Sequence, residues 1–380
     1  MKALLVFIST ALATAAWCEK PCAQPLQGLY ETGSIVLVED QVFGSEYEEE
    51  ESALFHATSV CVDDEGQVYV LDYKMYCVKK FGPGGELLRT FSRKGEGPGE
   101  LGRAYRMAIT PQGRLVVFDA DNHRFTVFDR SGDYVDARAF QGWVTGLHVL
   151  PDGSLILRYS IMTEDWMKRG SLYRVSRLAP DLVAETVIDS AFIQESEIVQ
   201  ATGTSMTTVG KPFIGQFHVA VSPAGNILTA LGDEYRVKIL TPSLEPIHEI
   251  TRAVARVGVT KADKEEYFQF FKDSDENFQI MVRQKVQFPK HKPYISALFT
   301  DHNGYILVEV PESTGSDDTM YYDVFSPGGR FVNRVEMTTL RTPVVFRNGF
   351  LYMGMSSGDE LPVVIRYRLQ AVANDDTSEP

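Results

Sequence analysis

One pattern of apolar and polar positions recurs along the chain. Two short apolar runs are joined by a turn that contains glycine, a polar break follows, and two more apolar runs are joined by a second turn. The clearest copy has the runs Met107–Ile109, Leu115–Phe118, Phe125–Phe128 and Tyr134–Val135. Runs of this length that are rich in Val, Ile, Tyr and Phe and bounded by turn residues are typical of β-strands. The pattern therefore predicts an all-β fold built from units of four antiparallel strands.

The first turn of each copy carries a glycine, and these glycines count the copies. They are Gly66, Gly113, Gly153, Gly225, Gly304 and Gly349, with spacings of 47, 40, 72, 79 and 45 residues. A four-stranded propeller blade takes roughly 40–50 residues. We therefore predict a six-bladed β-propeller whose two long intervals carry inserts at about 188–214 and 255–292. A β-sandwich with similar hairpins is the alternative, but it does not explain why the same pattern returns six times.

The ends of the chain predict how the propeller closes. The sixth copy has three apolar runs and then a polar tail, and an unassigned run, Ser34–Val38, precedes the first copy. Completing the last blade with an N-terminal strand removes the exposed edges of an open array. We expect Ile35–Val38 to pair alongside Val363–Arg368, with the propeller spanning 34–369 and a disordered tail at 370–380.

The second insert predicts a short helix. Thr260 and Asp263 have the spacing of a capping box, and Tyr267, Phe270 and Phe271 recur at helical spacing. We expect this amphipathic helix to be laid on the propeller, either as a lid over the channel mouth or as packing at its edge.

The first residues predict export. Lys2 precedes an apolar run, Ala3–Trp17, which is short for a membrane span and typical of a signal peptide, here assigned to residues 1–23. Cleavage after Ala16, Cys18 or Ala23 fits this pattern. No later segment reaches the ~18 uncharged apolar residues of a spanning helix. We expect a secreted or periplasmic protein without an integral membrane segment.

Cys61 and Cys77 fall in the first and third strands of one sheet, too far apart for a disulfide, so we expect free thiols.

Net charge narrows the choice of partners. The sequence has 51 acidic and 37 basic side chains and a formal net charge of −14. Proteins that bind bulk nucleic acid need a cationic surface that releases counterions from the phosphates. Nucleic acid is therefore not an expected partner.

Two segments carry a resemblance to a known family. Phe118–Asp129, with Asn122, His123 and Arg124 in its polar break, looks like the core of an NHL repeat, and the loop Arg93–Glu100 is similar to one in exported bacterial propellers. The chain thus resembles the NHL-repeat / TolB-like six-bladed β-propellers of exported bacterial proteins. The resemblance implies the fold, but says little about activity, because this fold hosts binding scaffolds, lyases, lactonases and sensor domains.

The sequence does not contain a recognisable motif for catalysis or for metal binding. No two of the seven histidines have a short metal-ligand spacing, and no nucleophile elbow is present. We expect Asp119 and Asp121 to bond nearby backbone amides, with Arg124 paired to one of them. No catalytic residue, metal ligand or cofactor is assigned. A divalent cation in the central channel stays an open alternative, because histidines of different blades could converge there.

Aromatic and basic residues gather instead before the first strands of the blades. They are Arg103, Tyr105, Arg106, Trp143, His218 and Tyr294. Such residues suit recognition on a propeller rim, although they could also wedge between blades. We therefore expect a non-catalytic binding or scaffold module that presents one face to a protein, peptide or glycan ligand. The alternatives are a metal-dependent hydrolase or lyase with its site in the channel, and a structural component of an envelope assembly. The oligomeric state stays open.

Overall fold

The computed structural model describes residues 28–372 apart from 46, 48, 49, 163–169, 203–204, 312–318 and 356–360. The predicted signal peptide, 1–23, and residues 373–380 of the predicted tail lie outside the described part. A single 3-10 turn, η1 (Leu29–Glu31), precedes the first strand.

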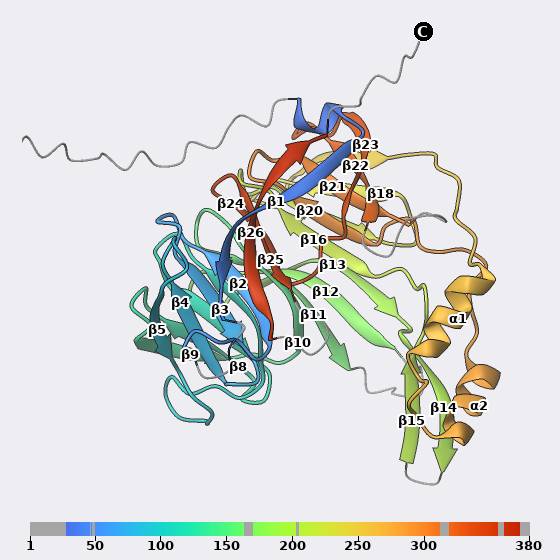
Figure 1. Cartoon of the computed structure of the whole chain (residues 1–380), viewed down its shortest axis with the longest axis horizontal. Helices are drawn as coiled ribbons and strands as arrows, with labels where there is room; N and C mark the ends of the chain where they lie inside the picture. Colours follow the sequence, from blue (N-terminus) through green and yellow to red (C-terminus); the bar gives the residue numbers. More distant parts are fainter. Residues whose placement is uncertain are drawn as a thin grey trace, which may run out of the picture.

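Four separate sheets each contain four consecutive antiparallel strands (Figure 1). The first holds β2 (Ala57–Val62), β3 (Val68–Asp72), β4 (Cys77–Phe81) and β5 (Leu87–Phe91). The second holds β6 (Ala104–Ile109), β7 (Leu115–Asp119), β8 (Arg124–Phe128) and β9 (Tyr134–Ala139). The third holds β10 (Trp143–Val149), β11 (Leu155–Met162), β12 (Ser171–Leu178) and β13 (Glu185–Ile193). The fourth holds β16 (Phe217–Val221), β17 (Ile227–Leu231), β18 (Arg236–Leu240) and β19 (Pro246–Thr251).

An eight-stranded sheet completes the structure. It contains β20 (Ala297–Thr300), β21 (Ile306–Val310), β22 (Thr319–Phe325), β23 (Phe331–Thr338), β24 (Val344–Arg347), β25 (Phe350–Met355) and β26 (Val363–Ala371), with β1 (Ser34–Phe43) between β23 and β26. The first strands of the four-strand sets contact one another in turn, β24 to β2 to β6 to β10 to β16 to β20. The fold is therefore an all-β propeller with four-stranded antiparallel blades.

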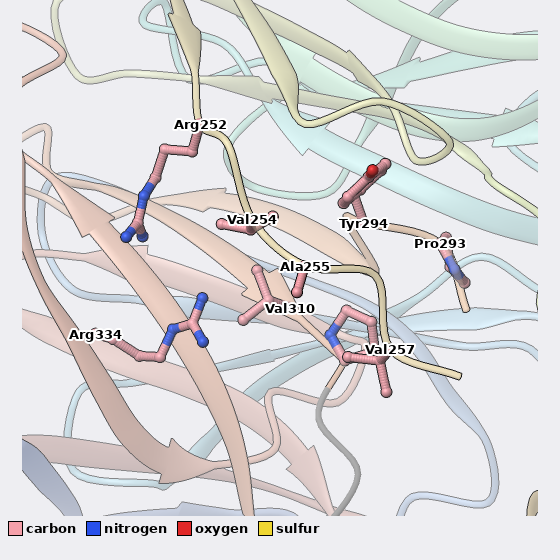
Figure 2. Close-up of a pocket in the computed structure, with 9 residues that line it drawn as sticks. Arg252, Val254, Ala255, Val257, Pro293, Tyr294, Val310 and Arg334 are labelled. Carbon is pink, nitrogen blue, oxygen red and sulfur yellow. The ribbon is translucent and has the colours of Figure 1, made fainter. Parts of the chain in front are cut away.

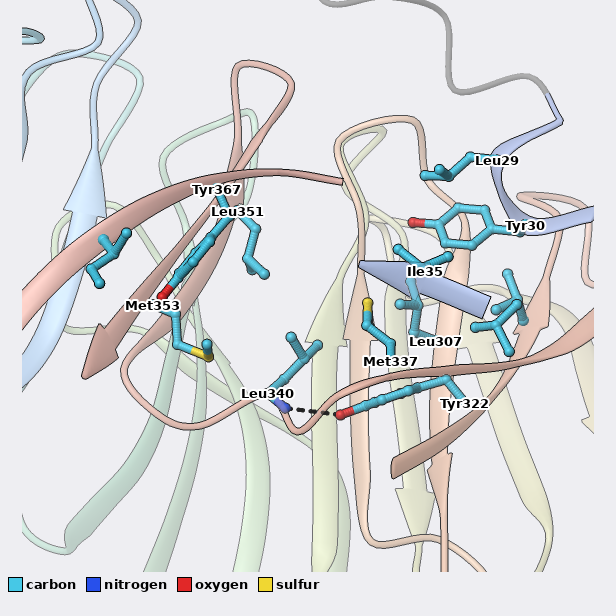
Figure 3. Packing of buried hydrophobic residues seen from close by; sticks show 13 residues of the cluster. Leu29, Tyr30, Ile35, Leu307, Tyr322, Met337, Leu340, Leu351, Met353 and Tyr367 are labelled. Atoms are coloured by element: carbon cyan, nitrogen blue, oxygen red, sulfur yellow. Dashed lines mark hydrogen bonds between the residues drawn. The ribbon is translucent and has the colours of Figure 1, made fainter. Parts of the chain in front are cut away.

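The predicted closure by the N-terminal strand is confirmed. β1 pairs antiparallel with β26, with Ile35 opposite Ala371 and Val38 opposite Arg368, and it also forms a short parallel pairing with β23. Figure 3 shows Ile35 packed with Met337 and Tyr322, whose hydroxyl accepts a hydrogen bond from Leu340 N at 2.9 Å. β26 continues to Ala371, so the strand ends two residues later than predicted.

The core lies between neighbouring sheets. Leu71 and Val78 of the first sheet pack with Met107, Val117 and Phe128 of the second, and all five are buried. Alternate side chains of a strand face opposite sides, so each sheet contributes to two such layers. Cys61 and Cys77 are buried free thiols on β2 and β4, as predicted, and burial raises the pKa of Cys77 to about 11.

The two inserts form one projecting unit, here called the arm. The first insert forms the hairpin of β14 (Ser196–Thr202) and β15 (Ser205–Gly210), and the second forms helices α1 (Lys261–Gln269) and α2 (Glu276–Lys285). The capping box of Thr260 and Asp263 is confirmed, but two helices replace the single one predicted. Figure 1 shows the helices beside the hairpin and away from the sheets β2–β5 and β6–β9. The expectation that the helix is laid on the propeller is wrong, because Tyr267 and Phe271 pack with the hairpin instead, while Phe270 is 86% exposed.

The two ends of the sheets define two faces. The turn face carries the connections from first to second and from third to fourth strand. The entry face carries the connections from second to third strand and from one set of four to the next. The arm, the loop Arg93–Glu100 and both cavities described below belong to the entry face. Binding and catalytic residues of rigid scaffolds concentrate in such variable connections.

Candidate functional site

Three aromatic rings from three adjacent sheets form a continuous row on the entry face. Tyr73 follows β3, Tyr105 lies on β6, and Trp143 begins β10. The rings of Tyr73 and Tyr105 are stacked with centroids 5.0 Å apart, and those of Tyr105 and Trp143 are tilted with centroids 5.1 Å apart. Trp143 is 42% exposed. Tyr73, Tyr105 and Trp143 are called the aromatic row below.

Polar groups border the aromatic row. Arg103 pairs with Asp121 at 2.6 Å, and both side chains are about half exposed. Burial and a hydrogen bond with the Tyr73 side chain raise the pKa of Tyr105. The row therefore offers flat apolar faces with hydroxyl groups and an ion pair at its edge, which suits an amphipathic ligand.

Arg106 lies next to the row and ties three inner strands together. β2, β6 and β10 each have a bulge at one extra residue, namely Thr58, Tyr105 and Thr145. The guanidinium of Arg106 donates to the carbonyl oxygen of all three, at 3.4, 2.8 and 2.9 Å. Bulges re-aim the strand and its side chains and recur beside functional sites.

Arg158 continues this connection to the next sheet. Its Nε donates to Thr145 Oγ1 at 3.0 Å, its Nη2 to Thr145 O at 3.4 Å, and its Nη1 to Phe217 O at 2.6 Å. Arg106 and Arg158 together link β2, β6, β10 and β16. Both are half-buried.

Two histidines neighbour these arginines. Burial, followed by the charges of Arg158 and Arg106, lowers the pKa of His148 to about 4. Burial and the charge of Arg158 lower the pKa of His218 to about 4 as well, and its Nε2 has no hydrogen-bond partner. Both rings are therefore neutral at physiological pH, and the positive charge of this region belongs to the arginines.

Two cavities of about 370 Å³ open on the entry face, and the one lined by His56 adjoins the aromatic row, because the rings of His56 and Tyr73 have centroids 5.3 Å apart. One lies between β19 and β21 and is lined by Tyr294, Arg252 and Arg334, among others; Figure 2 shows the two arginines on one side and Tyr294 on the other. Both arginines pair with the buried Asp323, at 2.6 and 2.7 Å. The other cavity is lined by His56, Lys74 and Pro343, among others.

The structure brings some of the predicted residues together and separates others. Tyr105, Trp143, Arg103 and Arg106 lie in one region. His218 faces the next sheet, where the backbone of Ile295 hydrogen-bonds to it, and Tyr294 lines a separate cavity. Most of these residues do not precede the first strands as predicted. The strands begin earlier, so four lie within them: Tyr105, Arg106, Trp143 and His218.

Sequence reasoning missed Tyr73, His148 and Arg158. Tyr73 stands in a polar break whose copies differ in composition. Arg158 had a usable signal, because it is the one charged residue in the apolar run Leu155–Tyr159. A charge within a strand that is otherwise buried needs a polar environment, and here the bulged carbonyl groups provide it.

The polar break after β7 has the predicted structural role, with one correction. Asp119 is buried and accepts a hydrogen bond from Gly102 N at 2.9 Å. The expected pairing of Arg124 with an aspartate is wrong: Arg124 donates to the carbonyl oxygens of Glu96, Gly97 and Glu100, each at 2.9 Å. Arg124 bonds to the loop Arg93–Glu100 because three carbonyl oxygens of this loop converge on its guanidinium group.

Within the part of the chain that the structure describes, no three His, Cys, Asp or Glu side chains are placed to hold a metal ion. None of the described helices is long and apolar enough to cross a membrane.

Comparison with known proteins supports the fold and the repeat. The NHL repeat family matches residues 56–81, one repeat before the copy with the sharpest motif. No curated protein sequence matches the chain. This match and the sheet arrangement above are consistent with an NHL-type β-propeller.

Solved structures agree at the level of the fold. A member of the DUF4221 family from Bacteroides vulgatus superposes with a TM-score of 0.55 at 11% identity, covering 90% of this chain and all of that one. A candidate exported protein from Bacteroides fragilis superposes with a TM-score of 0.52 at 9% identity, covering 90% of this chain and 97% of that one. At these identities the likeness shows the fold alone.

Proposed function

We propose that this protein is an exported binding module that receives a protein, peptide or glycan ligand on its entry face. We also propose that the eight-stranded sheet is two blades joined through β1, which makes the propeller six-bladed. Export follows from the sequence of residues 1–23 rather than from any contact in the fold.

The aromatic row carries this proposal. Tyr73, Tyr105 and Trp143 come from three sheets, yet their rings touch in one line, and Trp143 keeps 42% of its surface exposed. Tyrosine and tryptophan supply large contact areas while few torsions are frozen, which is why they dominate binding surfaces. If the row only packed between neighbouring sheets, we would expect its last ring, that of Trp143, to be buried.

Trp143 provides the test. Tryptophan occurs at 17, 143 and 166, and the first lies in the predicted signal peptide. In a Trp166→Phe variant of the mature chain, Trp143 is the single tryptophan and reports on the row through its fluorescence. We expect a ligand found by screening glycans and peptides to change this emission, and Tyr105→Ala to weaken its binding at least tenfold.

Tyr134→Ala is the matched control. Tyr134 begins β9 at the turn face and is 42% exposed, equal to Trp143. Its removal should leave binding unchanged. A ligand whose affinity falls with Tyr134→Ala but not with Tyr105→Ala would contradict the proposal.

A metal-dependent hydrolase or lyase at the propeller centre is the alternative proposal. Elemental analysis of the purified protein tests it. A stoichiometric, tightly held divalent ion would favour the enzyme over the binding module.

A further inference from the structure

We propose that Arg106 and Arg158 form an oxyanion-binding subsite at the centre of the entry face, which takes a carboxylate or phosphate group of the ligand. The identity of that ligand rests on the proposed function. The subsite itself does not, because simple anions can test it.

The two guanidinium groups are held unusually close. Arg106 Nε and Arg158 Nη2 donate to the same carbonyl oxygen, that of Thr145, at 2.9 and 3.4 Å. The two nitrogen atoms are therefore separated by no more than the sum of these distances. Two positive charges at such a distance repel each other, and the repulsion grows where protein replaces water.

No protein carboxylate offsets this repulsion among the described residues. Every hydrogen bond of the two guanidinium groups goes to a backbone carbonyl or to the Thr145 hydroxyl. Carbonyl dipoles orient the arginines but leave their net charge in place. An oxyanion would supply the missing counter-charge.

Two other arginine pairs of this protein show the usual solution. Arg252 and Arg334 share the buried Asp323. Arg366 and Arg368 share Asp40. The pair of Arg106 and Arg158 differs because it shares a neutral oxygen, and none of the described acidic side chains pairs with it.

The geometry also leaves donors free. Arg106 uses Nε and Nη1 for its three carbonyl bonds, while Nη2 has no acceptor among the described residues. Arginine binds carboxylate and phosphate well because its planar donors match two oxygen atoms at once. The aromatic row and the subsite share two strands: Tyr105 and Arg106 lie on β6, and Trp143 lies on β10 two residues before Thr145, whose carbonyl oxygen both arginines share. We therefore expect a ligand on the row to place its acidic group at this subsite.

The test is a titration of the whole mature protein with sodium phosphate and sodium acetate at low millimolar concentration, against sodium chloride at equal ionic strength. We expect saturable binding by calorimetry and a rise in Tm for at least one oxyanion. The preferred oxyanion identifies the acidic group as phosphate or carboxylate. If neither oxyanion differs from chloride, the proposal is wrong.

Substitutions locate the effect. Arg106→Gln or Arg158→Gln should weaken oxyanion binding at least about tenfold, because a charged hydrogen bond is lost. Arg124→Gln is the matched control, since Arg124 also donates to three carbonyl oxygens but shares none of them with a second described arginine. Equal loss in all three variants would contradict the subsite. If a Gln variant fails to fold, titration of Arg106→Lys and of the wild-type protein with the same oxyanions still tests the proposal.

The outcomes separate the two proposals. Oxyanion binding that depends on Arg106, together with ligand binding that ignores Tyr105, would keep the subsite and refute the aromatic row. The reverse result would keep the row and refute the subsite.

Discussion

The turn face and the entry face are made by the same strands but differ in their connections. On the turn face the same pair of backbone hydrogen bonds closes turn after turn, as in Asp63–Gln67 and Thr110–Arg114. On the entry face the connections range from 140–142 to 252–296, and few share a pattern. Uniform turns indicate that these segments serve to connect neighbouring strands and have no further role. Varied connections indicate that something besides the fold shaped them. Tyr73 lies in one of these connections, while the other two rings of the aromatic row and the paired arginines lie on the strands β6, β10 and β11.

The largest effect is expected on the turn face. Gly132 has φ +94°, and a Cβ there would lie 2.5 Å from the Phe91 ring. Gly132→Ala should lower the free energy of unfolding by about 2–5 kcal/mol, through left-handed strain and overpacking. Urea denaturation measures this loss. Gly328→Ala, where the nearest atom lies 4.0 Å away, should change it by less than about 0.5 kcal/mol. Equal losses would show that the turn face does not depend on glycine geometry.

A smaller loss of stability is expected at Asp119, a residue of the entry face that we assign to the structure and not to ligand binding. Asp119→Ala leaves the buried Gly102 N–H without its acceptor, so we expect a loss of about 1–3 kcal/mol in urea denaturation. Asp119→Asn keeps a carbonyl oxygen at the site and should lose less. Weaker oxyanion binding in Asp119→Asn would show that the role of Asp119 is not merely structural.

Stability should also depend on pH through the neutral histidines. The pKa values of His148 and His218 are about 4 in the folded protein and about 6.5 when unfolded. Between these values the unfolded chain binds more protons, so the free energy of unfolding should fall as pH drops from about 6.5 to 4. Denaturation across this range should show that His148→Gln reduces the slope by up to one proton. An unchanged slope would place His148 in a solvated environment.

The smallest effect on stability is expected at the edge of the aromatic row. Arg103 and Asp121 form an exposed ion pair, and solvent screening leaves such a pair little effect on stability. Arg103→Ala should therefore barely move Tm while it weakens binding of a ligand on the row. A large fall in Tm would instead assign Arg103 to packing between sheets.

Local signals predicted much of the fold, and non-local contacts limited the rest. The turn glycines mark positions of positive φ, so six of them revealed the repeat, and the unassigned run at Ser34–Val38 revealed the closure. The pattern of Tyr267 and Phe271 predicted that a helix would bury aromatic side chains, but not that a hairpin 60 residues earlier would cover them. The periodicity of apolar residues predicts that one side of a helix is buried, but it does not predict which segment of the chain covers that side.

The site was predicted in part for the same reason. Tyr105 and Trp143 were recognised by residue type and position. The pairing of Arg106 with Arg158 depends on bulges in three strands and on the approach of neighbouring sheets, which no single segment encodes. Tyr73 was missed because its ring joins the row across a sheet boundary.

Diffraction from crystals soaked in sodium selenate would locate a bound oxyanion, because selenium marks it by its anomalous scattering. We expect the strongest anomalous peak within hydrogen-bond distance of the Arg106 and Arg158 guanidinium groups, beside the aromatic row. Peaks confined to the turn face or the arm, with none between these two arginines, would contradict the proposed subsite.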